Sequence, residues 1–141
     1  MQPRTHIRAS LWTLAAFLAM GMWLEAMFGL RVAGIVDDPL RREFLRLGHA
    51  HGGLLALVNL ALAWALLQLH TPALWATRVR LAAWLGSVLV GVGFVGGGLW
   101  HGPTDPGPVV LLVPAGAMML VASIVATAMV RQSDAEPNKS S

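Results

Sequence analysis

Two histidines stand at the start of a long apolar run, in the sequence GHAHGGLL over residues 48–55. Neutral imidazole is a common metal ligand and also transfers protons near neutral pH, so His49 and His51 are the first candidates for chemistry. On a regular helix, side chains two positions apart point about 200° away from each other, so both cannot face one ion. Either Gly48 ends the regular helix beneath His49, or His51 alone faces the helix bundle while His49 faces another partner. We expect the second arrangement.

Three further ionisable residues lie near the ends of apolar runs, namely Glu25, His101 and Asp105. Glu25 lies about 7.5 Å from the end of its run and His51 about 6 Å from the start of the next, so the two could meet at one depth. A carboxylate that faces an imidazole is an arrangement that a membrane site needs, because an unpaired ion there is costly. The partner could be a proton, a metal ion or another side chain.

Together these residues predict a site for a transition metal ion. We expect His51 and His101 as ligands, with His49 as a substitute, and Glu25 as a ligand or as the partner that orients an imidazole. Asp105, in the loop after His101, is a further candidate metal ligand. Copper, iron and zinc all remain open. Methionines beside Glu25 would suit copper, although methionine also fills apolar cores; they are Met20, Met22 and Met27.

The composition places the chain among integral membrane proteins. Of its 141 residues, 56% are hydrophobic and only 12% are charged, whereas a soluble domain carries about a quarter charged residues. The absence of cysteine excludes disulfides, iron–sulfur clusters and cysteine-ligated zinc. The formal net charge of +3 comes from arginines at the ends of apolar runs. There is no dense basic patch with interleaved aromatics, so we expect the lipid bilayer as a partner and no nucleic acid.

Four apolar stretches are long enough to cross the hydrocarbon core, which needs roughly 20 helical residues. They cover residues 11–30, 47–69, 81–100 and 109–130. Because lipid offers no hydrogen bonds to the backbone, these spans should be helices. We therefore predict an all-α, integral membrane four-helix bundle as one domain over residues 1–131, followed by a disordered polar tail over 132–141.

The link between the first two spans carries a helix start signal. Asp38 fits an N-cap and Pro39 fits the first helical turn. The sequence therefore predicts a short interfacial helix over residues 40–46, between the first and second spans.

The basic residues favour an orientation with both termini inside. Six of them fall on the side of the termini and four on the other side, and the positive-inside rule places the richer side in the cytoplasm. The expected location is a bacterial inner membrane, with the His/Glu site at the periplasmic face. At the cytoplasmic side we expect His6 and His70 to meet headgroups and water. Asn59, deep in the second span, either extends the site inward or bonds to another helix.

The stretch HAHGGLL, residues 49–55, resembles the histidine helix of the haem–copper oxidase subunit I superfamily and of related small bacterial membrane proteins. In that superfamily the histidine of a His-Gly element near the outer face is an axial haem ligand. The resemblance carries this role to His51, which Gly52 follows, and it covers only this short stretch. Leu55 stands where the family motif continues to a methionine, and the copper-ligand histidines and any tyrosine are absent. These departures argue against oxygen reduction by this chain alone.

Three functions remain open from the sequence. The first is electron transfer or metal handling at the His/Glu site. The second is a structural role, as an accessory subunit of a larger membrane complex or as a homo-oligomer. The third span is rich in glycines, which allow close helix packing or make room for a flat cofactor. The third function is acid–base catalysis on a lipid-soluble substrate by Glu25 and a histidine, so whether the protein is an enzyme stays open.

Overall fold

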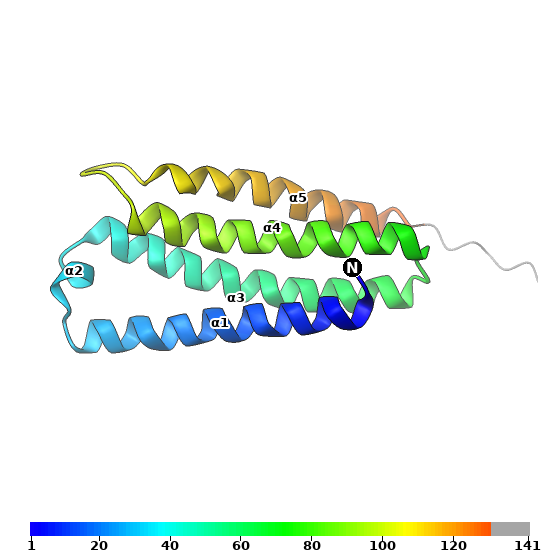
Figure 1. The fold of residues 1–141 in the computed structure, drawn as a ribbon, viewed down its shortest axis with the longest axis horizontal. Helices are drawn as coiled ribbons and strands as arrows, with labels where there is room; N and C mark the ends of the chain where they lie inside the picture. The colour runs from blue at the N-terminus through cyan, green and yellow to red at the C-terminus, as the bar shows by residue number, and fades with distance from the viewer. Residues whose placement is uncertain (131–141) are drawn as a thin grey trace, which may run out of the picture.

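The computed structural model describes residues 1–130, and these form an all-α four-helix bundle with no strand in the described range. The predicted tail over 132–141 lies outside the described residues. Each long helix runs antiparallel to the long helix before it in the chain (Figure 1). In chain order the elements are α1 Pro3–Gly29, α2 Ala33–Val36, α3 Pro39–Gln68, α4 Ala73–Leu99, the 3₁₀ helix η1 Pro108–Leu111 and α5 Leu112–Ala128.

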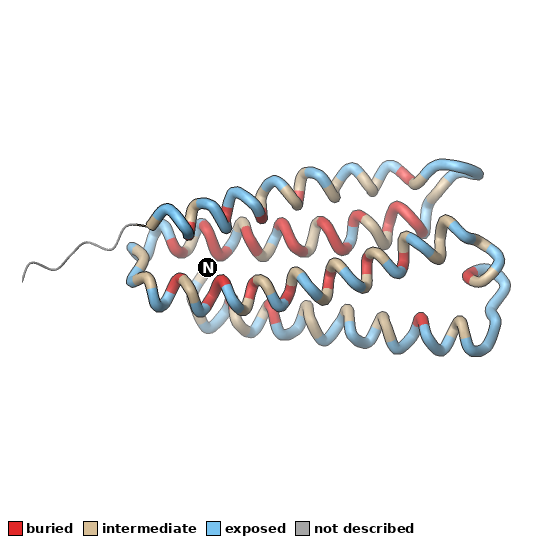
Figure 2. The backbone as a smooth tube through the Cα atoms, turned by 180° about the vertical axis from the view of Figure 1, so that it is seen from behind, coloured by how far each residue is buried: buried red, intermediate tan, exposed pale blue. Residues whose placement is uncertain are grey.

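Each long helix packs mainly against its neighbours in the sequence. α3 lies between α1 and α4, and α4 lies between α3 and α5, whereas α1 and α5 do not contact each other within residues 1–130. Buried positions therefore follow α4 along its length, while α1 is mostly exposed (Figure 2). We call the end with α2 and the 100–107 loop the α2 end. The opposite end, with Met1 and the α3–α4 turn, is the N-terminal end.

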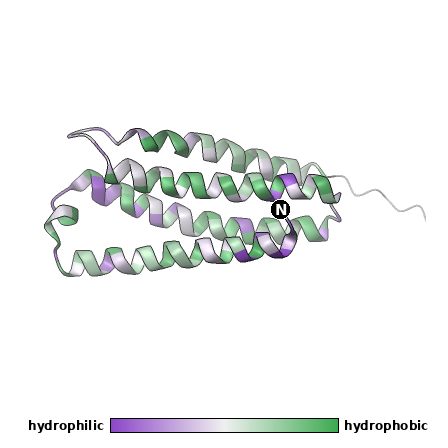
Figure 3. Cartoon of the chain, in the orientation of Figure 1, coloured by the Kyte–Doolittle hydropathy of each residue, from purple (hydrophilic) through white to green (hydrophobic). Residues whose placement is uncertain are grey.

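All four long elements are long and apolar enough to cross a membrane. Hydrophobic residues dominate the middle of the helices, and hydrophilic residues gather toward the two ends (Figure 3). This distribution agrees with the composition, since a bilayer would cover the apolar middle and leave both ends in the headgroup regions.

The helices extend beyond the apolar runs that the sequence predicts. α1 begins at Pro3 rather than at residue 11, and α4 begins at Ala73 rather than at residue 81. The predicted interfacial helix over 40–46 is not separate, because no breaker precedes the second span and α3 runs continuously from Pro39. The short helix between the first and second spans is instead the single turn α2.

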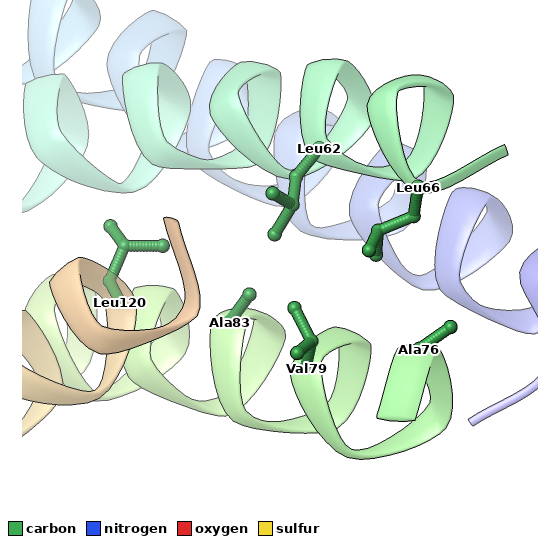
Figure 4. Close-up of a cluster of buried hydrophobic side chains, with 6 residues drawn as sticks. All are labelled: Leu62, Leu66, Ala76, Val79, Ala83 and Leu120. Carbon is green, nitrogen blue, oxygen red and sulfur yellow. The ribbon is translucent and has the colours of Figure 1, made fainter. Parts of the chain in front are cut away.

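A cluster of buried apolar side chains joins three helices toward the N-terminal end. It comprises side chains from α3, α4 and α5 (Figure 4): Leu62, Leu66, Ala76, Val79, Ala83 and Leu120. Nearby, α4 and α5 approach backbone to backbone. A Cβ added at Gly86 would lie 2.6 Å from the Gly116 oxygen, and one added at Gly116 would lie 2.5 Å from the Gly86 oxygen. Glycine in α4 therefore serves close helix packing.

Candidate functional site

The structure brings the five predicted site residues to the α2 end but does not gather them into one cluster. Glu25 is near the end of α1, His49 and His51 are near the start of α3, and His101 and Asp105 are in the loop after α4. Within residues 1–130, no group of three or more histidine, aspartate or glutamate side chains is arranged to hold a metal ion. The predicted residues therefore divide into separate local environments.

The first environment is a groove of about 590 Å³ between α1 and α3. Both Glu25 and His49 line it, together with the thioether of Met22 and the charged side chains of Glu43 and Arg46. The rest of its lining is mainly apolar and comes from the same two helices: Leu18, Leu24, Phe28, Leu47 and Ala50. The groove thus combines one imidazole, a carboxylate and an apolar wall.

His49 is held in one orientation by α1. Its Nδ1 donates to the backbone oxygen of Phe17 at 2.7 Å, and its ring lies over Gly21, where any Cβ would collide with it. A carbonyl oxygen can only accept, so Nδ1 carries a proton, and in the neutral imidazole Nε2 then has the lone pair. This is the orientation that histidine ligands of metals commonly have, with the distal ring nitrogen free to coordinate.

His51 faces a different side of α3. Its Nδ1 donates to the Leu47 oxygen one turn earlier at 2.9 Å, and its ring packs against Phe94 of α4 with centroids 4.8 Å apart. The two histidines therefore diverge, as their spacing predicts. The structure, however, places His49 rather than His51 on the groove that contains Glu25.

His101 belongs to a second environment, with Asp38 at the start of α3. Its Nε2 lies 2.8 Å from Asp38 Oδ2, and its Nδ1 faces the Gly102 oxygen. Both ring nitrogens thus face oxygen atoms of the protein. His101 therefore offers no free ring nitrogen to a metal ion in this conformation.

Asp38 connects the loop after α4 to the start of α3, which it also caps. Its Oδ1 accepts from the Arg41 backbone N–H at 3.0 Å, which caps α3, and Oδ2 lies 3.7 Å from the Arg41 guanidinium. The hydrogen bond from the Arg41 backbone N–H is the main cause that lowers the pKa of Asp38. Desolvation opposes this effect, and the contact with His101 lowers the pKa further. Asp38 is therefore a carboxylate at neutral pH.

The remaining predicted residue, Asp105, is exposed in the loop. Its side chain accepts a hydrogen bond from the Thr104 hydroxyl at 2.9 Å, and its backbone oxygen accepts from the Gly102 N–H. These contacts close the loop on itself and place Asp105 in the role of a turn residue.

The sequence analysis missed a buried polar cluster in the core toward the N-terminal end. His6 is fully buried, instead of lying at the interface, and its Nε2 donates to Asn59 Oδ1 at 2.9 Å. Asn59 in turn donates to the Leu55 oxygen and to Ser87 Oγ, so one cluster joins α1, α3 and α4. Of the two roles predicted for Asn59, the structure shows the bond to another helix. The only sequence signal for this cluster was the position of Asn59 deep in an apolar run.

No protein-family model, curated protein or solved structure matches the chain. The fold and the groove therefore define the class by themselves. It is a four-helix bundle of membrane-spanning length, with a histidine-containing groove between its first and second long helices.

Proposed function

We propose that the protein binds a metal-containing cofactor, with haem the best fit, in the groove between α1 and α3, and that it serves electron transfer or metal handling. The observation that carries this proposal is the 2.7 Å hydrogen bond from His49 Nδ1 to the Phe17 oxygen, which leaves Nε2 free on the groove. A protein-bound metal ion usually takes three or more protein ligands. Haem iron can be held by a single histidine, and a single histidine is what this groove offers.

The size and lining of the groove support a cofactor of this kind. Its volume of about 590 Å³ falls within the range of about 300–1,000 Å³ that is typical of small-molecule sites. The apolar wall suits a porphyrin face, and Arg46 can pair with a propionate. Met22 supplies a thioether on the same groove, a donor that haem proteins combine with histidine. Glu25 would then tune the charge at the metal.

The proposal changes the ligand expected from the sequence. The oxidase resemblance assigns the haem ligand to His51, and residue position also favoured His101. In the structure both ring nitrogens of His101 contact protein oxygens, and His51 packs on Phe94 away from the groove. For the orientation, the sequence count of six basic residues on the side of the termini against four on the other side favours the α2 end at the periplasmic face of an inner membrane.

A spectrum of the purified protein tests the cofactor. We expect a Soret band and a reduced-minus-oxidised difference spectrum from detergent-purified protein, with stoichiometric iron by elemental analysis. His49→Gly should lose the band, and added imidazole should restore it, because the small ligand can take the place of the missing side chain. His51→Ala is the matched control, two residues away on the same helix, and should keep the band.

Two results would contradict the proposal. The first is that wild-type protein produced with ample haem and metal carries neither. The second is that His51→Ala loses the cofactor while His49→Gly keeps it. The second result would identify His51 as the ligand, as the resemblance implies.

A further inference from the structure

The N-terminal end contains a second pocket, of about 490 Å³, that is separate from the proposed cofactor groove. It lies where the start of α1, the end of α3 and the start of α4 meet, beside the α3–α4 turn. Its polar lining comes from these elements and includes one arginine, Arg80, with the neighbouring polar residues Gln2, His70, Thr71 and Thr77.

Arg80 is buried, with only 5% of its surface exposed, yet residues 1–130 supply no counter-ion for it. No ion pair of Arg80 occurs within the described range 1–130, and its Nε has no hydrogen-bond acceptor there. The buried hydroxyl of Thr71, on the same pocket, also has no partner in that range. A buried cation in a membrane-spanning helix is costly unless an anion pairs with it.

Within residues 1–130, the surroundings of the pocket supply no negative charge. Every carboxylate side chain in that range lies toward the α2 end: Glu25, Asp37, Asp38, Glu43 and Asp105. At the pocket, α4 begins at Ala73 with no acidic residue in its first turn, so its free N–H groups also favour an anion.

The depth of Arg80 suits an anion from the headgroup region. It lies about 10 Å along α4 from Ala73, at about 1.5 Å per residue. Long basic side chains at this depth extend toward the interface, where phosphate groups are found. The guanidinium group binds a phosphate through paired N–H donors, and Thr71 offers a hydroxyl donor beside it.

We propose that this pocket binds a phosphate group and that, in the membrane, the group is the headgroup of an anionic phospholipid. The pocket supplies the Arg80 guanidinium, the Thr71 hydroxyl and the start of α4, and the acyl chains would follow the apolar surface of the bundle. This site is independent of the cofactor proposed at the α2 end.

Native mass spectrometry of the full chain, with phosphatidylglycerol and phosphatidylcholine at equal concentration in detergent, tests the proposal. Wild-type protein should retain phosphatidylglycerol preferentially. Arg80→Gln should weaken this retention about fivefold, the value of one basic contact to an anionic lipid. Arg78→Gln is the matched control, because Arg78 is exposed on the same helix, and it should retain the lipid as wild type does.

Melting temperatures measured with inorganic phosphate identify the source of the phosphate group. If inorganic phosphate alone raises the melting temperature of wild type as much as phosphatidylglycerol does, and not that of Arg80→Gln, the site is a phosphate site filled from solution. Arg80→Lys keeps the charge and should retain part of the lipid preference, which covers the case in which Arg80→Gln does not fold.

The proposal is overturned if wild type shows no preference for phosphatidylglycerol, or if Arg80→Gln and Arg78→Gln retain it equally. Asp134 and Glu136 lie outside the described residues, so a full-length variant with Asp134→Asn and Glu136→Gln completes the test. A lipid preference that appears only in that variant would assign the pocket to the carboxylates of the chain itself and would also overturn the proposal.

Discussion

The two ends of the bundle treat polar residues in opposite ways. At the α2 end, charged groups form pairs near the surface, such as Asp38 with His101, and His49 keeps an open nitrogen on a groove. Toward the N-terminal end, polar groups bond inside the core, where His6 and Asn59 have no exposed surface. The same residue type, histidine, is thus a candidate ligand in one region and a core hydrogen-bond donor in the other, and only its neighbours distinguish the two roles.

Among the variants that test this comparison, Asn59→Leu should have the largest effect on stability. The change removes the acceptor of His6 and leaves a buried N–H without a partner, so we expect the free energy of unfolding to fall by about 2 kcal/mol. Thermal unfolding in detergent, followed by circular dichroism, measures this. A double variant with His6→Leu should recover part of the loss, since it removes both polar partners. Strictly additive losses would show that the pair does not act as a unit.

A smaller effect is expected at the α2 end, where close backbone packing replaces buried hydrogen bonds. A Cβ at Gly98 would lie 2.6 Å from Phe44 Cβ and 3.3 Å from the Arg41 oxygen, so Gly98→Ala must push α3 and α4 apart. We expect a loss of about 1 kcal/mol in the same unfolding measurement. Gly53→Ala on α3 is the matched control, because its Cβ would meet open space, and it should be neutral or stabilising. If Gly98→Ala and Gly53→Ala lose the same free energy of unfolding, close packing at Gly98 is not the cause of the loss.

The smallest effect should appear only at low pH. Because folding lowers the pKa of Asp38, its contribution to stability is complete above the unfolded-state pKa of about 3.9 and is lost as the pH falls through the lower folded-state pKa. The melting temperature of wild type should therefore decrease below about pH 4. Asp38→Asn, which still caps the helix, should flatten this decrease, and the exposed Glu43→Gln should not. If the melting temperature of Asp38→Asn decreases with falling pH as steeply as that of wild type, other carboxylates cause the acid sensitivity.

Long apolar runs were sufficient to predict the fold class. The four helices follow from the hydrophobicity of the runs, and the divergence of His49 and His51 follows from helix geometry alone. Runs of apolar residues mark only what lipid must cover, so they could not show that α1 and α4 extend beyond these runs toward the N-terminal end.

Which histidine faces Glu25 could not be predicted, because the rotation of α3 about its axis depends on tertiary packing. The Phe17 ring of α1 sits where a Cβ of Gly52 on α3 or of Gly91 on α4 would be, and this fit sets the face that α3 presents to α1. The contact between Asp38 and His101 joins residues 63 positions apart. Asp38 already had a sufficient local explanation as an N-cap, so nothing in the sequence indicated a second partner.

The order of the helices in space also bears on how the bundle assembles. α3 packs on α1, α4 on α3, and α5 on α4, with no contact between α1 and α5 in the described residues. Each helix can therefore dock on the one synthesised just before it, without waiting for a distant partner. Because such contacts are local in sequence, the entropy lost in closing each connection is small. A nascent chain could thus form the groove between α1 and α3 once α3 is in place, before α4 and α5 leave the ribosome.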